Sequence, residues 1–194
     1  MKHSRNAAIL VDEMNVIGQL HRKGIKGIRP WNIFYQEIQR HLGIRAEKHF
    51  YCSNVPKEQF PERFVKRLGF FNDLRRSEIS VHEGFVVTNA RKQLIEKGVD
   101  VLLAMDLSQF AMEGVQDIVI CTGDGDLVPA IKRAQTYGAR IHVVVSKFIP
   151  AANIVDVADT VISLETILAR IPEHKIMKLQ NNREAKIHVE TVLV

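Results

Sequence analysis

The chain has little cysteine and no long apolar segment. Its two cysteines, Cys52 and Cys121, show neither the spacing of metal ligands nor a disulfide framework. No run of the sequence approaches the roughly 18 apolar residues of a membrane helix. The apolar run 7–11 is too short for the core of a signal peptide. These absences predict a cytoplasmic protein that does not enter a membrane.

The composition suits one globular domain with a substantial core. The chain has 194 residues, of which 46% are hydrophobic and 25% charged. The formal net charge of +5 is compatible with a polyanionic partner, although many proteins reach it without one. The basic residues gather in two groups, which are Arg22, Lys23, Lys26 and Arg29, and Arg63, Lys66, Arg67, Arg75 and Arg76.

Apolar segments alternate with segments of helical periodicity along the chain. Strands are predicted at 7–11, 45–52, 79–87, 117–122, 140–145 and 160–164. Helices are predicted at 15–21, 31–42, 61–76, 100–112, 127–138, 151–158 and 165–171, with a loop at 22–30. The stretch 91–97 fits a helix or, preferably, the return strand of a hairpin. This alternation predicts an α/β fold with a mostly parallel sheet and no internal repeat.

Acidic residues stand where predicted strands end or helices begin. Asp12 follows the first strand, Asp124 and Asp126 follow the strand 117–122, and Asp100 begins a helix that contains Asp106. Ligands of open parallel sheets bind at the carboxyl ends of strands, where strand order reverses. The helix from Asp100 leads into the strand 117–122, so it should start at that same edge. We therefore expect the acids to converge there.

Converging carboxylates need compensation by positive charge. Mg²⁺ or Mn²⁺ would supply it, because hard cations take oxygen ligands and commonly bind substrate phosphate as well. In a two-metal arrangement, one ion activates water and the other stabilises the leaving oxygen of a phosphodiester. The pattern therefore indicates a phosphate-directed metal site.

Each of these residues also has a structural interpretation. Asp100 could be a helix N-cap, Asp106 could be a supporting group or lie on a solvated face, and Asp124 and Asp126 could be turn or cap residues. Asn15 could cap a helix or orient Asp12. Glu13 is expected to point to solvent. The residues Trp31, Phe34 and Tyr35 could stack on bases, but core packing is favoured.

The segments 11–15, 97–106 and 122–130 resemble the NYN domain, the LabA-like branch of the PIN-like nuclease superfamily. The resemblance covers residues 5–170 and leaves 171–194 as a C-terminal extension of open role. It implies a three-layer α/β/α fold with a central, mostly parallel sheet and metal-dependent ribonuclease chemistry. It carries the catalytic acids onto Asp12, Asp100 and Asp124, and further acidic positions onto Asp106 and Asp126.

Beyond these catalytic acids, the combined prediction assigns two further sets of residues and one partner. Metal ligation by Mg²⁺ or Mn²⁺ is assigned to Asp12, Asp100, Asp124, Asp126 and Asp106. Substrate binding is assigned to Asn15, Thr122, Arg22, Lys23, Lys26, Arg29 and Lys97. The partner is RNA, no membrane partner is expected, and a homo-oligomer is possible. The departures from the family pattern, such as Thr122 in place of Ser, remove no acid.

Two other functions remain open. A non-catalytic RNA-binding or scaffold module on the same fold would bind RNA without metal-dependent turnover. A different phosphate enzyme, with Asp12 as nucleophile, would follow a haloacid-type phosphatase pattern, but Met14 stands where that pattern needs a second Asp. A Toprim-like site lacks the expected glutamate after the first strand, unless Glu13 serves.

Overall fold

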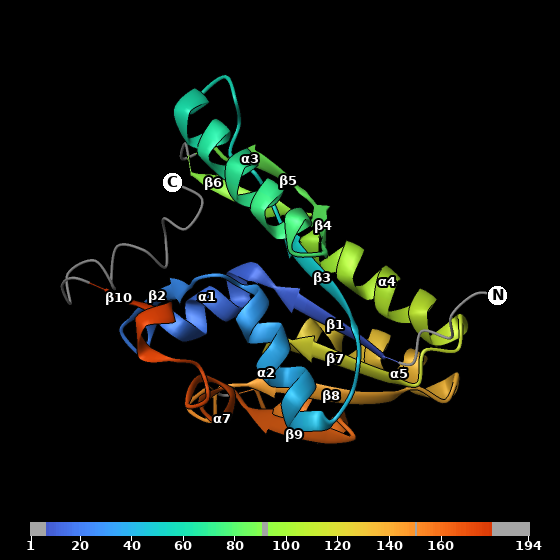
Figure 1. The fold of residues 1–194 in the computed structure, drawn as a ribbon. Coiled ribbons are helices and arrows are strands. Elements are labelled where there is room, and N and C mark those ends of the chain that lie inside the picture. Colours follow the sequence, from blue (N-terminus) through green and yellow to red (C-terminus); the bar gives the residue numbers. More distant parts are fainter. Residues whose placement is uncertain (1–6, 91–92, 150, 180–194) are drawn as a thin grey trace.

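A computed structural model describes residues 7–90, 93–149 and 151–179 of the chain (Figure 1). Its centre is a six-stranded parallel sheet in the order β4-β3-β1-β7-β8-β9. The strands are Ala7–Asp12 (β1), Glu47–Cys52 (β3), Ile79–Glu83 (β4), Asp117–Cys121 (β7), Arg140–Val145 (β8) and Thr160–Ser163 (β9).

The chain builds this sheet outward from β1 in two directions. It passes first to β3 and β4 on one side and later to β7, β8 and β9 on the other, so strand order reverses between β1 and β7. Val11 of β1 pairs with Cys121 of β7. The next residues, Asp12 and Thr122, therefore lie side by side at the carboxyl edge. This is the switch point at which open parallel sheets bind their ligands.

Helices cover both faces of the sheet. One face is covered by α1 (Glu13–His21), α2 (Asn32–Leu42), α3 (Pro61–Arg76) and α7 (Leu164–Leu168), and the other by α4 (Val99–Met112), α5 (Val128–Thr136) and α6 (Ala152–Val157). Every residue of β1 is buried, with Ile9 and Val11 in one core and Ala8 and Leu10 in the other. Successive side chains of a strand point to opposite faces. The predicted three-layer α/β/α, PIN-like fold is confirmed.

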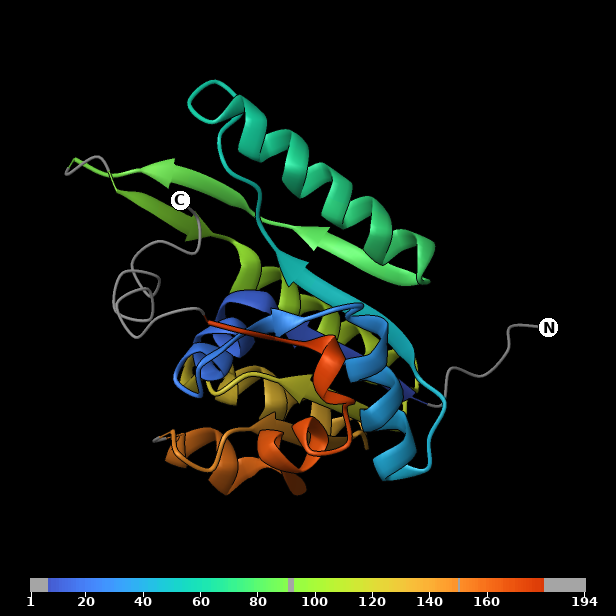
Figure 2. The ribbon, with the colours of Figure 1, turned by 60° about the vertical axis from the view of Figure 1, so that its left-hand side comes forward.

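Two small antiparallel sheets and two 3₁₀ turns complete the fold. The strand β2 (Ile25–Ile28) pairs with β10 (Ile176–Lys178), and β5 (Phe85–Thr88) pairs with β6 (Leu94–Lys97). The turns are η1 (Gly125–Leu127) and η2 (Glu173–Lys175). Figure 2 shows the hairpin of β5 and β6 alongside α3, beyond β4 at the edge of the central sheet. The hairpin leads directly into α4.

The predicted strand 79–87 is in fact two strands, separated at Gly84. A Cβ at Gly84 would lie 2.6 Å from the carbonyl oxygen of Lys97 and 2.7 Å from Cγ2 of Val99. No side chain fits there, so glycine permits the chain to leave the central sheet and start the hairpin. The preferred return strand at 91–97 is confirmed for the part that is described, since residues 91–92 lie outside it.

Two further segments differ from the sequence-based expectation or extend it. The predicted loop 22–30 contains β2, and the beginning of the segment 171–194 contains its partner β10. The apolar end 188–194 lies outside the described residues. Within the described ranges, no helix is both long and apolar enough to cross a membrane.

Candidate active site at the carboxyl edge of the sheet

Asp12 ends β1 and also caps helix α1. Its Oδ1 accepts a hydrogen bond from the backbone N–H of Asn15 at 3.1 Å, and its Oδ2 accepts one from the Thr122 hydroxyl at 2.9 Å. The residue is only 4% exposed. Burial raises the pKa of Asp12 to about 7, against these two hydrogen bonds and with help from the charges of Asp100 and Glu96. Such a carboxyl group takes up a proton or needs a nearby cation.

Thr122 and Asn15 connect the ends of β1 and β7. The hydroxyl oxygen of Thr122 accepts a hydrogen bond from the backbone N–H of Asp124 at 3.2 Å. The Asn15 Oδ1 accepts hydrogen bonds from the backbone N–H of Gly123 at 2.8 Å and from Gln19 Nε2 at 2.7 Å. Thr122 is fully buried, so its predicted contact with substrate does not fit its position. Its hydroxyl instead holds Asp12 and the backbone of Asp124 in place.

The second and third acidic clusters face each other. Asp124 is the N-cap of η1, and its Oδ1 accepts a hydrogen bond from the backbone N–H of Asp126 at 2.9 Å. Asp100 lies in the first turn of α4 and is exposed. The pKa of Asp100 is raised by partial burial and then by the charges of Asp124 and Asp126. The three clusters are therefore close enough to act on one another electrostatically, as the topology predicted.

Asp100 is not the N-cap of its helix. That position belongs to Gly98, whose φ of 81° lies in the left-handed region, and no side chain caps α4 there. The capping interpretation of Asp100 is therefore wrong. Its carboxylate has no capping role and faces the same edge as Asp124.

A fifth acid, Glu96, belongs to the same edge and was missed in the sequence. It lies on β6, and the Ser53 hydroxyl donates a hydrogen bond to its Oε2. Burial raises the pKa of Glu96 despite this hydrogen bond, and the charges of Glu13 and Asp100 raise it further. The only available signal was the hairpin prediction, which brings 91–97 back toward the start of α4. We call Asp12, Glu96, Asp100, Asp124 and Asp126 the acidic rim.

Asp106 does not join the acidic rim. Its Oδ2 accepts a hydrogen bond from the Tyr51 hydroxyl at 2.8 Å and lies 3.1 Å from Nδ1 of His82. His82 in turn contacts His49, with 3.0 Å between Nε2 and Nδ1. Asp106 stands six positions after Asp100 in the helix, a rise of about 9 Å. The arrangement places Asp106 in a polar cluster between α4, β3 and β4, and gives no support to its prediction as a metal ligand.

Glu13 is buried, contrary to the expectation that it points to solvent. It is 5% exposed and forms a two-pronged salt bridge with Arg67 of α3, in which Nη1 donates to Oε1 at 2.7 Å and Nη2 donates to Oε2. The same Nη2 donates to the Ser53 carbonyl at 2.8 Å. The pair ties the start of α1 to α3 and to the end of β3. A guanidinium fork matches a carboxylate in this geometry.

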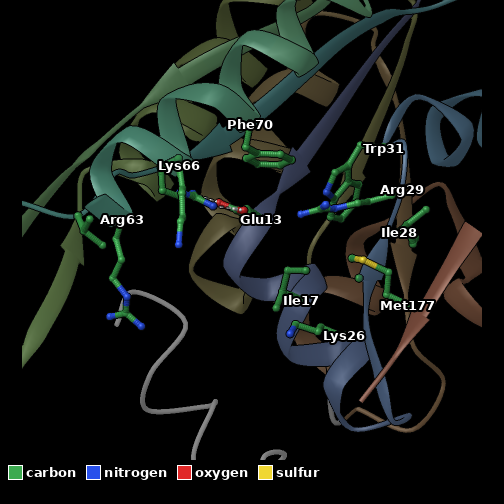
Figure 3. A pocket seen from close by; sticks show the side chains of 13 residues that line it. Glu13, Ile17, Lys26, Ile28, Arg29, Trp31, Arg63, Lys66, Phe70 and Met177 are labelled. Atoms are coloured by element: carbon green, nitrogen blue, oxygen red, sulfur yellow. Dashed lines mark hydrogen bonds and ion pairs between the residues drawn. The ribbon is translucent and has the colours of Figure 1, made fainter. Parts of the chain in front are cut away.

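The predicted substrate-binding cations do not gather in one place. Lys23 pairs with Glu165 at 3.1 Å between Nζ and Oε1, while Arg22 and Lys97 are exposed. Lys26 and Arg29 instead line a cavity of about 360 Å³ together with residues of the second basic group (Figure 3). We call this cavity the basic pocket. Its lining residues are Glu13, Ile17, Lys26, Gly27, Ile28, Arg29, Trp31, Val55, Arg63, Lys66, Arg67, Phe70 and Met177.

The acidic rim suits a hydrated divalent cation. Among the described residues, no three Asp, Glu, His or Cys side chains are gathered as direct ligands of one ion. Mg²⁺, however, keeps several waters and binds through one or two carboxylates plus substrate phosphate. The rim offers carboxylate oxygens, and the pKa values of Asp12, Glu96 and Asp100 are raised first by burial and then by the charges of neighbouring acids. The donor chemistry therefore fits Mg²⁺ or Mn²⁺.

Comparison with known proteins agrees with this architecture. The sequence matches the NYN domain over residues 6–165. A search of curated proteins gave no match. The crystal structure of VPA0982 from Vibrio parahaemolyticus, a protein of unknown function, has a TM-score of 0.63 at 14% identity and covers 91% of this chain and 100% of that chain. At this identity the likeness shows the fold alone.

A second solved structure is too dissimilar to bear on the fold. It is a PLP-bound protein from Clostridium difficile assigned as an aminotransferase, with a TM-score of 0.27 and 11% identity over 72% of this chain and 38% of that chain. The family match, by contrast, spans most of the sequence and confirms the resemblance seen in the acidic motifs. The chain belongs to the NYN domain family.

Proposed function

We propose that this protein is a metal-dependent ribonuclease that hydrolyses phosphodiester bonds of RNA. Membership of the NYN family places the chain in the PIN-like nuclease superfamily. The observation that carries the proposal is the buried Asp12, at the switch point, with a pKa raised to about 7 by burial and by the neighbouring acids. A buried carboxyl group beside further acids is costly for the fold and is typical of a functional site.

Each residue of the site has a role in the proposal. Asp12, Asp100 and Asp124 hold Mg²⁺ or Mn²⁺, with Asp126 as an additional ligand. When bound, the ion neutralises the carboxylates, polarises the phosphate and lowers the pKa of water. With its pKa raised to about 7, Asp12 would hold the ion in its ionised form, so binding of the ion should be tighter at higher pH. Thr122 and Asn15 keep Asp12 and the 122–126 loop in register.

Charge and free thiols support the proposed substrate and compartment. The chain has a net charge of +5 although its candidate site is acidic. This suits a polyanionic substrate that binds to basic residues outside the rim and is cleaved at the rim. Exposed Lys97 and Arg22 extend the set of cations available to RNA. Cys52 and Cys121 are free and buried, as is usual in a reducing compartment, which supports a place in the cytoplasm.

The test is cleavage of a fluorescently labelled single-stranded RNA in MgCl₂, MnCl₂ or EDTA. We expect cleavage with either cation and none in EDTA. Asp12→Asn and Asp124→Asn should lose at least about 100-fold in rate, while Asp73→Asn, an exposed position on α3, should not. Titration of Mn²⁺ by electron paramagnetic resonance reports ion binding independently of turnover. Undiminished cleavage by both acid variants would refute the proposal.

A second candidate is an RNA-binding module without turnover. The basic pocket favours it, because its cations do not depend on the acidic rim. This candidate predicts salt-sensitive RNA binding with intact RNA after prolonged incubation with either cation. The cleavage assay above therefore separates the two candidates directly.

A further inference from the structure

Five cations line the basic pocket, and four of them are not paired with an acid of the described part of the chain. Arg63 and Lys66 extend from α3, and Lys26 and Arg29 lie on the side of β2 (Figure 3). Among the described residues, none of these four forms a salt bridge, whereas Arg67 is held by Glu13. All four are exposed to solvent, and the guanidinium of Arg63 also lies over the Phe60 ring, 5.7 Å from its centroid. Like charges gathered around one cavity attract an anion.

The wall of the pocket between these cations is apolar and partly aromatic. It includes Trp31, Phe70, Ile17 and Met177. Trp31 is only 6% exposed and packs against Phe34 and Phe50, so it forms a fixed wall. A wall of this kind offers little to a plain phosphate ion. It suits a ligand with an aromatic or apolar part next to its negative charge.

The pocket lies close to the acidic rim but on the other side of the sheet edge. Glu13, which lines the pocket, directly follows Asp12 of the rim. The guanidinium of Arg67 contacts the carbonyl of Ser53, and the hydroxyl of Ser53 contacts Glu96. A flexible strand that crosses the rim therefore reaches the pocket within a short length.

We propose that the basic pocket binds a nucleotide of the RNA strand a short distance from the cleaved bond. The base lies against Trp31 and Phe70, and the adjoining phosphates contact Lys26, Arg29, Arg63 and Lys66. This inference rests on the proposed function for the identity of the polymer. It adds a binding subsite, formed by α3 and the β2 segment, that is separate from the acids.

The test is RNA binding in EDTA, measured by fluorescence anisotropy of a labelled single-stranded RNA, so that cleavage plays no part. The double variant Arg63→Gln with Lys66→Gln removes two phosphate contacts. For single strands each contact contributes about 0.7 to the slope of log K against log salt, so the slope should fall by about 1.4, or about 25-fold in affinity at 0.1 M salt. The control Lys132→Gln with Arg133→Gln makes the same charge change on α5, in the opposite layer.

A second variant tests the aromatic part of the pocket. Phe70→Leu should weaken RNA binding at least about fivefold, since a stacked base contributes a factor of that order or more, and should leave inorganic polyphosphate binding unchanged. Equal loss for RNA and polyphosphate, or no loss for RNA, would overturn the nucleotide assignment. Equal affinities of the α3 and α5 double variants would overturn the pocket itself. A protein that binds RNA as expected but fails to cleave it would refute only the proposed function.

Discussion

Replacing Asp12 with asparagine should make the ion-free protein more stable while it removes cleavage. The folded-state pKa of Asp12 is about 7, raised by burial from an ordinary value of 3.8. Between these values the folded protein holds a proton that the unfolded chain has lost, so stability falls as pH rises from about 4 to about 7. Three pKa units correspond to about 4 kcal/mol.

Asparagine should recover only part of this free energy. Its amide carries no charge, but it replaces one of the oxygens that accept from Asn15 and Thr122. We therefore expect a gain of about 1–3 kcal/mol in the free energy of unfolding at pH 8 in EDTA. Urea unfolding followed by far-ultraviolet circular dichroism measures it, with Asp73→Asn as the exposed control. The gain should vanish near pH 4, where Asp12 is protonated.

Two results would refute this reasoning. The first is an Asp12→Asn variant that is less stable than the parent protein at pH 8. The second is a gain of the same size at pH 4 and pH 8, because that would attribute the effect to packing rather than to charge. In the presence of Mn²⁺ the order should reverse, since only the parent protein gains stability from a bound ion.

Three further perturbations test other parts of the site. Glu13→Gln should lower the free energy of unfolding by about 2–3 kcal/mol. This is less than for a fully buried pair, because the Arg67 side chain is 24% exposed. A loss below about 0.5 kcal/mol in urea unfolding would contradict a structural role of the pair. Glu96→Gln should lower the pKa of Asp12, because the charge of Glu96 helps to raise it. The pH at which Mn²⁺ binding is half-maximal should therefore fall. Calorimetric titration at several pH values measures this, and an unchanged half-maximal pH would show that the two carboxylates are independent. Burial raises the pKa of Glu165, but hydrogen bonds from two serines and a lysine outweigh it and bring it to about 2, so its contribution is complete above about pH 4.5 and is lost as pH falls toward 2. The stability difference between the parent and Glu165→Gln should therefore shrink between pH 7 and pH 3, and a constant difference would count against this account.

Much of the fold could be predicted because its elements have strong local signals. Buried parallel strands such as β7 and β8 appear as short apolar runs, and α3 begins and ends at the residues that periodicity suggested. β2 was missed because it has four residues, one of them Gly27, and its partner β10 lies at the far end of the described chain. The break at Gly84 was missed because the apolar pattern continues through it, and only the contact with Lys97 and Val99 forbids a side chain.

The candidate site divides in the same way. Asp12, Asp100 and Asp124 could be predicted to share an edge, because topology alone brings strand ends and a helix start together. Glu96 could not, because its position depends on where the hairpin packs. Glu13 was expected in solvent because nothing near it in sequence announces Arg67 as a partner. The positions of Glu96 and Glu13 thus depend on contacts between segments that are distant in the sequence, which local patterns do not reveal.

The hairpin that carries Glu96 has a consequence for how this active edge could change. A glycine stands at each end of the hairpin, Gly84 after β4 and Gly98 before α4. Gly84 has no room for a side chain and Gly98 has a left-handed φ, so the backbone is closely constrained at both junctions. Asn89, near the outer end of β5, lies five residues after Gly84 and nine before Gly98 along the chain. The length and outer surface of the hairpin can therefore vary while the end of β6 next to α4 still places the Glu96 carboxylate at the rim. The hairpin is therefore a part of the protein whose outer end can change without moving the carboxylates of the rim.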